Sequence, residues 1–351
     1  MIVAALGGCL DPAAERTRRD FDEVGRAALG TIEARIDQGT ALRLDAAARF
    51  VRFRANAPTV TITLRSSDAA PQRVALEVAN VAAGSTASPA AELRDAGHNA
   101  VAFDLDVPPG GAAAVTIAAP GADLPAPFAF AWVGDVQGGL ADFARVRARI
   151  DADPALELVV FAGDVTQNGT AAQLDDFVAA ADLLARPWYT VVGNHEGFDG
   201  SMAEFQRRIG RLNTTFDYRG ARFLLVDSAA STIDPRARDF MAGALGPAGP
   251  ALRVAGMHVP PLDWAGLRDG GFASRLEAAA VLAQLATGGV DLLLAGHIHS
   301  LHQGREAGIE TVVSGNGGVS ATPDLDGVGV HYLAISADPA REELAIAVVT
   351  P

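Results

Sequence analysis

The sequence contains a single cysteine, Cys9, and no lysine, so all 28 of its basic residues are arginine. A lone cysteine excludes an intrachain disulfide. No segment approaches the roughly 20 apolar residues that a transmembrane helix needs, so no membrane-spanning helix is expected. The missing lysine, together with abundant alanine, glycine and proline, indicates the codon bias of a GC-rich genome and carries no functional information.

Acidic residues outnumber basic ones, which gives the chain a formal net charge of −14. This excess argues against a surface for nucleic acids or for an anionic membrane. An anionic substrate would therefore have to be attracted by local arginine or by bound metal ions. With 351 residues, of which 49% are hydrophobic and 20% charged, the chain is expected to be globular, with one large domain or two smaller ones.

The lone cysteine lies in a short motif near the start of the chain. Leu6-Gly7-Gly8-Cys9 resembles the lipobox of bacterial lipoproteins, whose cysteine is acylated and becomes the mature N-terminus. Residues 2–6 resemble the end of the apolar region of a signal peptide, although no basic segment precedes them. The resemblance implies an exported protein that is periplasmic or attached to the membrane through a lipid on Cys9. The alternative is a chance match in a soluble protein.

The first 120 residues change from a helical to a strand pattern. Residues 1–40 are predicted to hold the lipobox-like start and a helical spacer, because apolar residues recur at intervals of three and four from Phe21 to Ile36. Residues 41–120 contain five segments that alternate apolar and polar residues and are separated by turns. This alternation predicts a small all-β sandwich domain similar to immunoglobulin and fibronectin domains.

The rest of the chain is predicted to form an α/β domain. Residues 121–127 contain two prolines and are predicted to form a stiff linker. From residue 128 to residue 351, short apolar strands alternate with helical segments, and two hairpins are expected. The predicted helices are 139–151, 170–185, 201–209, 235–245 and 274–287, and the predicted hairpins are 215–228 and 330–349.

Five predicted buried strands of this α/β domain end in polar residues. A single histidine after a buried strand is more often structural than functional, but five polar strand ends together make that interpretation improbable. Open α/β sheets bind ligands at the carboxyl ends of their strands, and Asp, Asn and His carry the oxygen and nitrogen ligands that suit divalent metals. The polar residues are Asp135 and Gln137, Asp164, Asn194 with His195 and Glu196, His258, and His297 with His299.

In their order along the chain, these blocks resemble the calcineurin-like metallophosphoesterases. The family pattern is D-x-H, G-D-x-x-x-x-G, G-N-H-E/D, a lone His, and G-H-x-H. Four blocks match it: Gly163-Asp164 through Gly169, Gly193-Asn194-His195-Glu196, His258, and Gly296-His297-Ile298-His299. The first block, Asp135-Val136-Gln137, departs from it because glutamine stands where the family usually has histidine.

The resemblance implies a fold and a reaction. The fold would be a four-layer β-sandwich flanked by helices, with metals at one end of the strands. The reaction would be hydrolysis of a phosphate mono- or diester by water that two divalent ions activate, the ions being Mn, Fe, Zn or Mg. Asp164 would bridge the two ions. Asp135, His299 and Gln137 would complete the first site, and Asn194, His258 and His297 the second.

The resemblance also separates a catalytic residue from the ligands. His195 would stabilise charge or protonate the leaving oxygen, which suits a pKa near neutrality. Glu196 would either orient the ring of His195 or cap the following turn. Gln137 offers an amide oxygen, or an NH₂ group that holds a water, in place of an imidazole nitrogen. It should weaken the first site and shift its preference toward harder metals.

Two other functions remain compatible with the sequence. Purple acid phosphatases also carry a sandwich before a metallophosphatase domain, but they need a tyrosine at the position of Gln167. The non-enzymatic alternative is a surface lipoprotein that keeps the fold and binds a ligand or partner with a weakened metal site. Gln137 is the residue that keeps this alternative open.

Overall fold

The computed structural model describes the whole chain except residues 1–11, 200–201, 264–265, 267–269 and 320–326. Cys9 and the lipobox-like motif therefore lie outside the described residues. Among the residues that are described, no helix combines the length and apolarity needed to cross a membrane.

The predicted helical spacer is shorter than expected. Helix α1 covers only Ala13–Asp22, and the following residues form strands β1 (Arg26–Leu29) and β2 (Ile32–Ile36). In β2 every second residue is buried. Ile32 and Ile36 fit this alternation as well as they fit a helical repeat, because a spacing of four satisfies both periods. The prediction of a helix after residue 22 was therefore wrong. Ala34 is buried together with Ile32 and Ile36, and burial of every second residue is the pattern of a strand.

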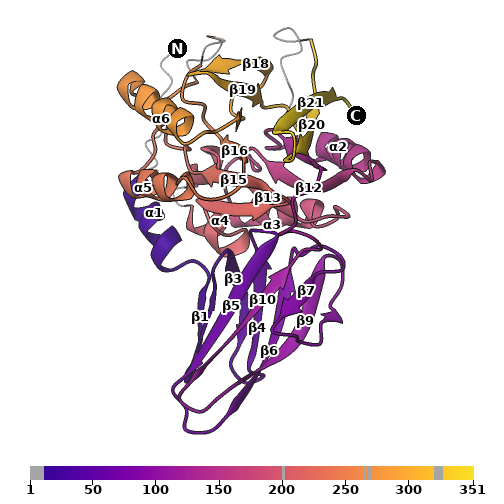
Figure 1. Ribbon diagram of the computed structural model, residues 1–351, viewed down its shortest axis with the longest axis vertical. Coiled ribbons are helices and arrows are strands. Elements are labelled where there is room, and N and C mark those ends of the chain that lie inside the picture. The colour runs from indigo at the N-terminus through magenta and orange to yellow at the C-terminus, as the bar shows by residue number, and fades with distance from the viewer. Residues whose placement is uncertain (1–11, 200–201, 264–265, 267–269, 320–326) are drawn as a thin grey trace.

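The first ten strands form two facing sheets of five strands, which lie at one end of the molecule (Figure 1). Their inward side chains share one apolar core, which contains Ile62 and Leu64 of one sheet and Val51 and Phe53 of the other. The predicted alternation is therefore observed, with the strands beginning at residue 26 and not at residue 41. That this region folds as a separate domain stays a prediction. One sheet contains β1, β2, β5 (Thr59–Ser66), β10 (Ala112–Ala118) and β7 (Thr86–Ser88), and the other β3 (Gly39–Asp45), β4 (Phe50–Ala55), β6 (Gln72–Ala79), β9 (Ala100–Val107) and β8 (Arg94–Asp95).

The C-terminal part contains two further sheets, packed face to face. Phe130 of one sheet contacts Phe223 of the other, with their ring centroids 5.0 Å apart. The first sheet has the order β13 (Trp188–Thr190), β12 (Leu156–Phe161), β11 (Phe128–Val133), β20 (Tyr332–Asp338) and β21 (Glu343–Val349). The second has the order β14 (Thr214–Tyr218), β15 (Ala221–Val226), β16 (Leu252–Met257), β17 (Leu292–Ala295), β19 (Ile309–Ser314) and β18 (Leu301–Glu306).

Helices cover the outer faces of both sheets, which completes the four layers. Helices α2 (Leu140–Ala152) and α3 (Ala171–Ala181) pack Phe143 and Phe177 on the first sheet. Helices α5 (Pro235–Ala244) and α6 (Arg275–Thr287) pack on the second, and the short α4 (Ala203–Arg208) lies beside α3. The predicted helices and both hairpins are thus present, and the mixed α/β fold is confirmed.

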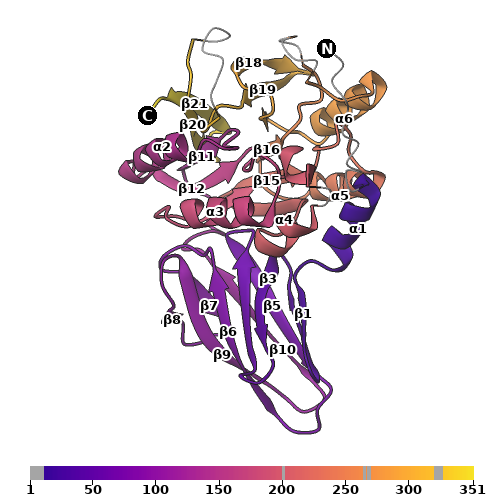
Figure 2. The ribbon, with the colours of Figure 1, turned by 180° about the vertical axis from the view of Figure 1, so that it is seen from behind.

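Buried charged groups join the N-terminal elements to the C-terminal part. Helix α1 lies against α5 in both views of the molecule (Figures 1 and 2), and its Arg16 forms a buried ion pair of 2.6 Å with Asp227 after β15. The carboxylate of Asp20 accepts hydrogen bonds from the backbone N–H groups of Leu212 and Asn213. One face of α1, with Arg16, Thr17 and Asp20, is therefore buried against the C-terminal part.

Candidate metal centre

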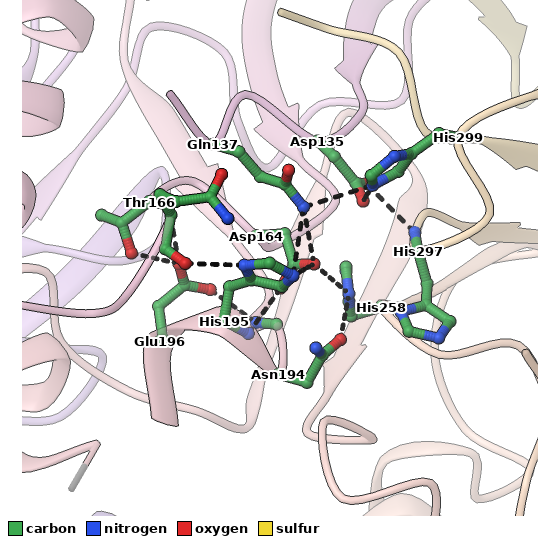
Figure 3. A network of polar contacts seen from close by, with 12 residues as sticks. Asp135, Gln137, Asp164, Thr166, Asn194, His195, Glu196, His258, His297 and His299 are labelled. Carbon is green, nitrogen blue, oxygen red and sulfur yellow. Dashed lines mark hydrogen bonds and ion pairs between the residues drawn. The ribbon is translucent and has the colours of Figure 1, made fainter. Parts of the chain in front are cut away.

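The sheet topology brings the five polar blocks to one place. Strands β11, β12 and β13 run parallel in one sheet, and β16 and β17 run parallel in the other. Parallel strands present their carboxyl ends at the same edge of a sheet, so the residues that follow them converge. Figure 3 shows this convergence of Asp135, Gln137, Asp164, Asn194, His195, His258, His297 and His299.

The glycines of the motifs are required because the loops approach each other closely. A Cβ atom at Gly193 would collide with the carboxylate of Asp164, and one at Gly296 would lie 2.7 Å from Oδ1 of Asp135. Three site residues also adopt left-handed backbone conformations, which cost about 1–3 kcal/mol each and persist only where the surroundings impose them. These are Gln137, Asp164 and His297, with φ of 45°, 47° and 68°.

Asp135, Asp164 and His299 form the first group of potential ligands, and one atom from each lies within 4.8 Å of the others. Asp135 is fully buried; its Oδ1 accepts the backbone N–H of His297 at 3.0 Å. Its Oδ2 lies 3.2 Å from Nε2 of His299 but accepts no hydrogen bond from the described residues. A buried carboxylate oxygen without a donor fits a position that a cation occupies.

Asp164, His258 and His297 form the second group, again with one atom from each within 4.8 Å of the others. Nδ1 of His258 lies 2.7 Å from the carbonyl oxygen of Ala162 and donates its proton to it. Nε2 then faces the site and is the ring atom that would bind a metal ion in place of a proton. It lies 3.1 Å from Oδ2 of Asp164 and 3.1 Å from Oδ1 of Asn194.

Asp164 is the one residue that belongs to both of these groups. The division into two groups is the one that the family resemblance implies, and Asn194 lies beside the second group as expected. The donors are carboxylate oxygens, imidazole nitrogens and an amide oxygen, which fit divalent ions such as Mn, Fe, Zn or Mg. The individual ligand roles stay predictions.

Gln137 extends between the first group and His195. Its Nε2 lies 3.2 Å from Nε2 of His299, 3.4 Å from Oδ2 of Asp164 and 3.3 Å from Nε2 of His195. The two ends of an amide are exchanged by a half-turn of its last torsion. The side chain can therefore direct either its oxygen toward the first group or its NH₂ toward an oxygen acceptor there, which are the two roles expected from the sequence.

His195 is held at the site without belonging to either ligand group. Its Nδ1 donates to the carbonyl oxygen of Gln167 at 2.7 Å, and its backbone N–H donates to Oδ1 of Asp164 at 2.8 Å. Nε2 faces the site, 3.8 Å from Oδ2 of Asp164. Gln167 thus orients the imidazole through its backbone, a contact that sequence reasoning missed because a carbonyl group carries no residue-specific signal.

Glu196 neither orients the ring of His195 nor caps the following turn, so both alternatives expected from the sequence were wrong. Its carboxylate is fully buried and accepts hydrogen bonds from the N–H and hydroxyl groups of Thr166, at 3.0 and 2.9 Å, and from the N–H of Gly193, at 2.9 Å. It therefore ties the loop after β12 to the loop after β13. Burial, reinforced by the charge of Asp164, raises the pKa of Glu196 to about 7.

The two central residues of the site stabilise each other's charged forms. Burial alone would lower the pKa of His258, but the adjacent carboxylate of Asp164 outweighs it and raises that pKa to about 9. Burial alone would raise the pKa of Asp164, but the imidazoles of His258 and His195 hold it well below its usual range. The site thus attracts positive charge, and a bound metal ion would compete with the proton of His258.

These features agree with comparisons to known proteins. The family model for calcineurin-like phosphoesterases matches residues 128–301, and this part of the chain belongs to that family. The family assignment supports a metal-dependent hydrolase of phosphate esters.

Individual proteins are similar to parts of this chain in sequence or in fold. A probable glycerophosphodiester phosphodiesterase from Arcobacter nitrofigilis is 38% identical over 53 residues, which are 15% of this chain and only 19% of that relative. A purple acid phosphatase from yellow lupin (Lupinus luteus) seeds superposes with a TM-score of 0.55 at 15% identity, over 84% of this chain and 70% of its own. A dimetal phosphatase from Danio rerio superposes with a TM-score of 0.50 at 14% identity, over 63% of this chain and 98% of its own. At these identities the two structures establish a shared fold.

Proposed function

We propose that this protein hydrolyses a phosphate mono- or diester with two divalent metal ions. The observation that carries the proposal is the position of Asp164, whose buried carboxylate belongs to two ligand groups at once. Asp135, His299 and Gln137 would hold the first ion with it, and Asn194, His258 and His297 the second. When bound, such a pair of ions supplies activation of water and neutralisation of the charge on the phosphate.

His195 would act on the leaving group. Because Nδ1 donates to Gln167, Nε2 is the ring atom left to carry a transferable proton toward the site. An imidazolium at this position donates that proton to the oxygen of the departing alcohol, and before that it stabilises the negative charge on the phosphate. The buried hydrogen bonds of Glu196 keep the turn that carries His195 in place.

The two alternative functions are less well supported. The likeness to a purple acid phosphatase extends to the N-terminal sheets, but the residue at the tyrosine position is Gln167, whose contact with the site is its backbone carbonyl. A binding protein with a weakened first site is supported by Gln137 alone. One experiment separates the binding protein from the proposed enzyme.

That experiment is a metal titration combined with an ester screen. Chelator-treated protein is reloaded with Mn, Zn, Mg or Fe, and release of phosphate or alcohol is measured over mono- and diesters. We expect two metals per chain and turnover of at least one ester class. Asp176→Asn on the exposed face of α3 serves as a control that removes a carboxylate outside the site. Two bound metals without turnover of any ester would favour the binding protein.

We also propose that the protein is exported and attached to a membrane through a lipid on Cys9. The support is the lipobox-like sequence alone. Mass spectrometry of protein from the native host should find an acylated cysteine at the mature N-terminus. An unmodified peptide from Met1 through Cys9 in a soluble fraction would contradict this.

A further inference from the structure

Phe198 is an exposed aromatic residue beside His195, the proposed proton donor. It follows the 3₁₀ turn η1 (His195–Gly197), and half of its side chain, 50%, is exposed to solvent. Its ring centroid lies 4.3 Å from that of His195, with an angle of 38° between the two planes. In a 3₁₀ turn, residues three positions apart lie above one another, so the sequence spacing itself produces this contact.

The exposure of Phe198 is imposed by the turn. Its backbone N–H donates to the carbonyl oxygen of His195 at 3.2 Å, and Glu196 fills the interior of the same turn with three hydrogen bonds. The buried side of the turn is therefore occupied by the carboxylate of Glu196, which three hydrogen-bond donors hold in place. Phe198 consequently presents its ring on the outer side of the turn. The part of the ring that stays exposed to water adds nothing to the stability of the fold.

His195 has one ring face against Phe198, and its two nitrogens are directed elsewhere. Nδ1 faces Gln167, and Nε2 faces Asp164 and Gln137. A leaving oxygen that takes the proton from Nε2 would carry the rest of its alcohol past the neighbouring ring. We propose that Phe198 forms a subsite for the leaving group and favours esters whose alcohol carries an aromatic ring, either an aryl group or a nucleobase. This proposal rests on the proposed function.

The test compares alcohols of similar acidity that differ in shape. Metal-loaded protein is assayed with benzyl, cyclohexylmethyl and ethyl phosphates, as monoesters or as methyl diesters, according to which class is hydrolysed. Wild type should prefer the benzyl ester, and Phe198→Ala should lower kcat/KM for it by about tenfold, chiefly through KM, with a smaller effect on the ethyl ester. Phe198→Tyr should restore the preference.

Two controls isolate the subsite. Leu183→Ala removes another exposed apolar side chain, 59% accessible, which follows the C-terminal end of α3, and should leave all rates unchanged. A nucleoside phosphate is compared with glycerol phosphate in the same variants. If its advantage over glycerol phosphate exceeds that of the benzyl over the ethyl ester, the preferred group is a nucleobase; otherwise it is an aryl group. An equal loss on benzyl and ethyl esters would show that Phe198 only positions His195, and this would overturn the subsite, as would the absence of any loss in Phe198→Ala.

The subsite can also be tested without catalysis. Benzylphosphonate and methylphosphonate are compared by calorimetry with the metal-loaded protein. Tighter binding of benzylphosphonate that disappears in Phe198→Ala supports the subsite even if no ester is hydrolysed, a result that would refute only the proposed reaction. Equal binding of both probes by wild type overturns the subsite independently of turnover.

Discussion

Two buried clusters of charged groups in this molecule differ in how their charges are balanced. At the contact between α1 and the C-terminal part, Arg16 donates from Nε and Nη2 to the two oxygens of Asp227, at 2.6 and 3.0 Å. At the metal centre, Oδ2 of Asp135 has no hydrogen-bond donor among the described residues, and Nε2 of His258 lies 3.1 Å from oxygens of both Asp164 and Asn194.

The difference separates a structural cluster from a binding site. A buried carboxylate that is paired with arginine needs no further partner, because the chain supplies both charges. A group of carboxylates and imidazoles that point toward one another needs a positive charge from outside, and in its absence a proton on His258 takes that place. The first cluster should therefore affect stability, and the second metal content and activity.

The largest effect is expected from Asp164→Asn. The variant keeps the volume of the side chain but removes the charge shared by both ligand groups. Mutation of a residue that only hydrogen-bonds to a metal ligand costs about 10- to 100-fold in metal affinity. Loss of the Asp164 carboxylate, a ligand itself, should therefore cost more than ~100-fold. Elemental analysis after dialysis should find both metals depleted and the activity lost. Full retention of two metals by the variant would contradict the bridging role.

His195→Ala should lower kcat by about 10²–10⁴-fold, the range expected for loss of a general acid. Metal content should stay at the wild-type level, because His195 lies outside both ligand groups. Elemental analysis and steady-state kinetics of the same preparation measure both quantities. Loss of metal in the variant would instead identify His195 as a ligand.

Arg16→Met should lower the free energy of unfolding by about 3–5 kcal/mol, because it leaves the buried carboxylate of Asp227 without its cation. The measurement is urea unfolding followed by fluorescence. Arg18→Met is the matched control on the same helix, since the pair that Arg18 forms with Glu23 is exposed and contributes little. Equal metal content in wild type and Arg16→Met would show that the two clusters are independent; a loss of metal would show that they are coupled.

The contact at α1 should also depend on pH through Asp20. Burial, opposed by Arg211 and by three N–H donors, raises the pKa of this carboxyl to about 6. A folded-state pKa above the unfolded value means that its contribution to stability is present below pH ~4 and is lost as the pH rises through 6. The loss amounts to roughly 3 kcal/mol. Unfolding of wild type and Asp20→Asn between pH 4 and 7 measures it, and parallel pH dependences would contradict this prediction.

The smallest effect is expected from Gln137→His. An imidazole nitrogen in place of an amide should strengthen the first site and increase retention of Zn, by about tenfold in affinity. Competition titrations with a chromogenic chelator, with activity measured in parallel, compare the two forms. If wild type already holds two Zn ions as tightly as the variant does, position 137 does not belong to the ligand shell.

Much of the metal centre could be predicted from the sequence because its determinants are local. Each block is a buried strand followed by a glycine or a tight turn and then by polar residues, and strand periodicity, glycine and residue chemistry are all visible within a few positions. The helices had similar local signals; Thr170 and Ser274, for example, cap α3 and α6 by accepting the backbone N–H three residues later.

The tertiary structure alone decided the features that depend on distant partners. Residues 32–36 form a strand because they pair with β5, where Ala34 lies opposite Leu64 and Ile36 opposite Ile62. Glu196 became a link between two loops because the N–H of Thr166 lies 30 residues earlier in the chain, and Arg16 found its carboxylate 211 residues away. A sequence states which charges and lone pairs exist; which of them meet, and whether they balance or leave room for a metal, is determined when the chain folds.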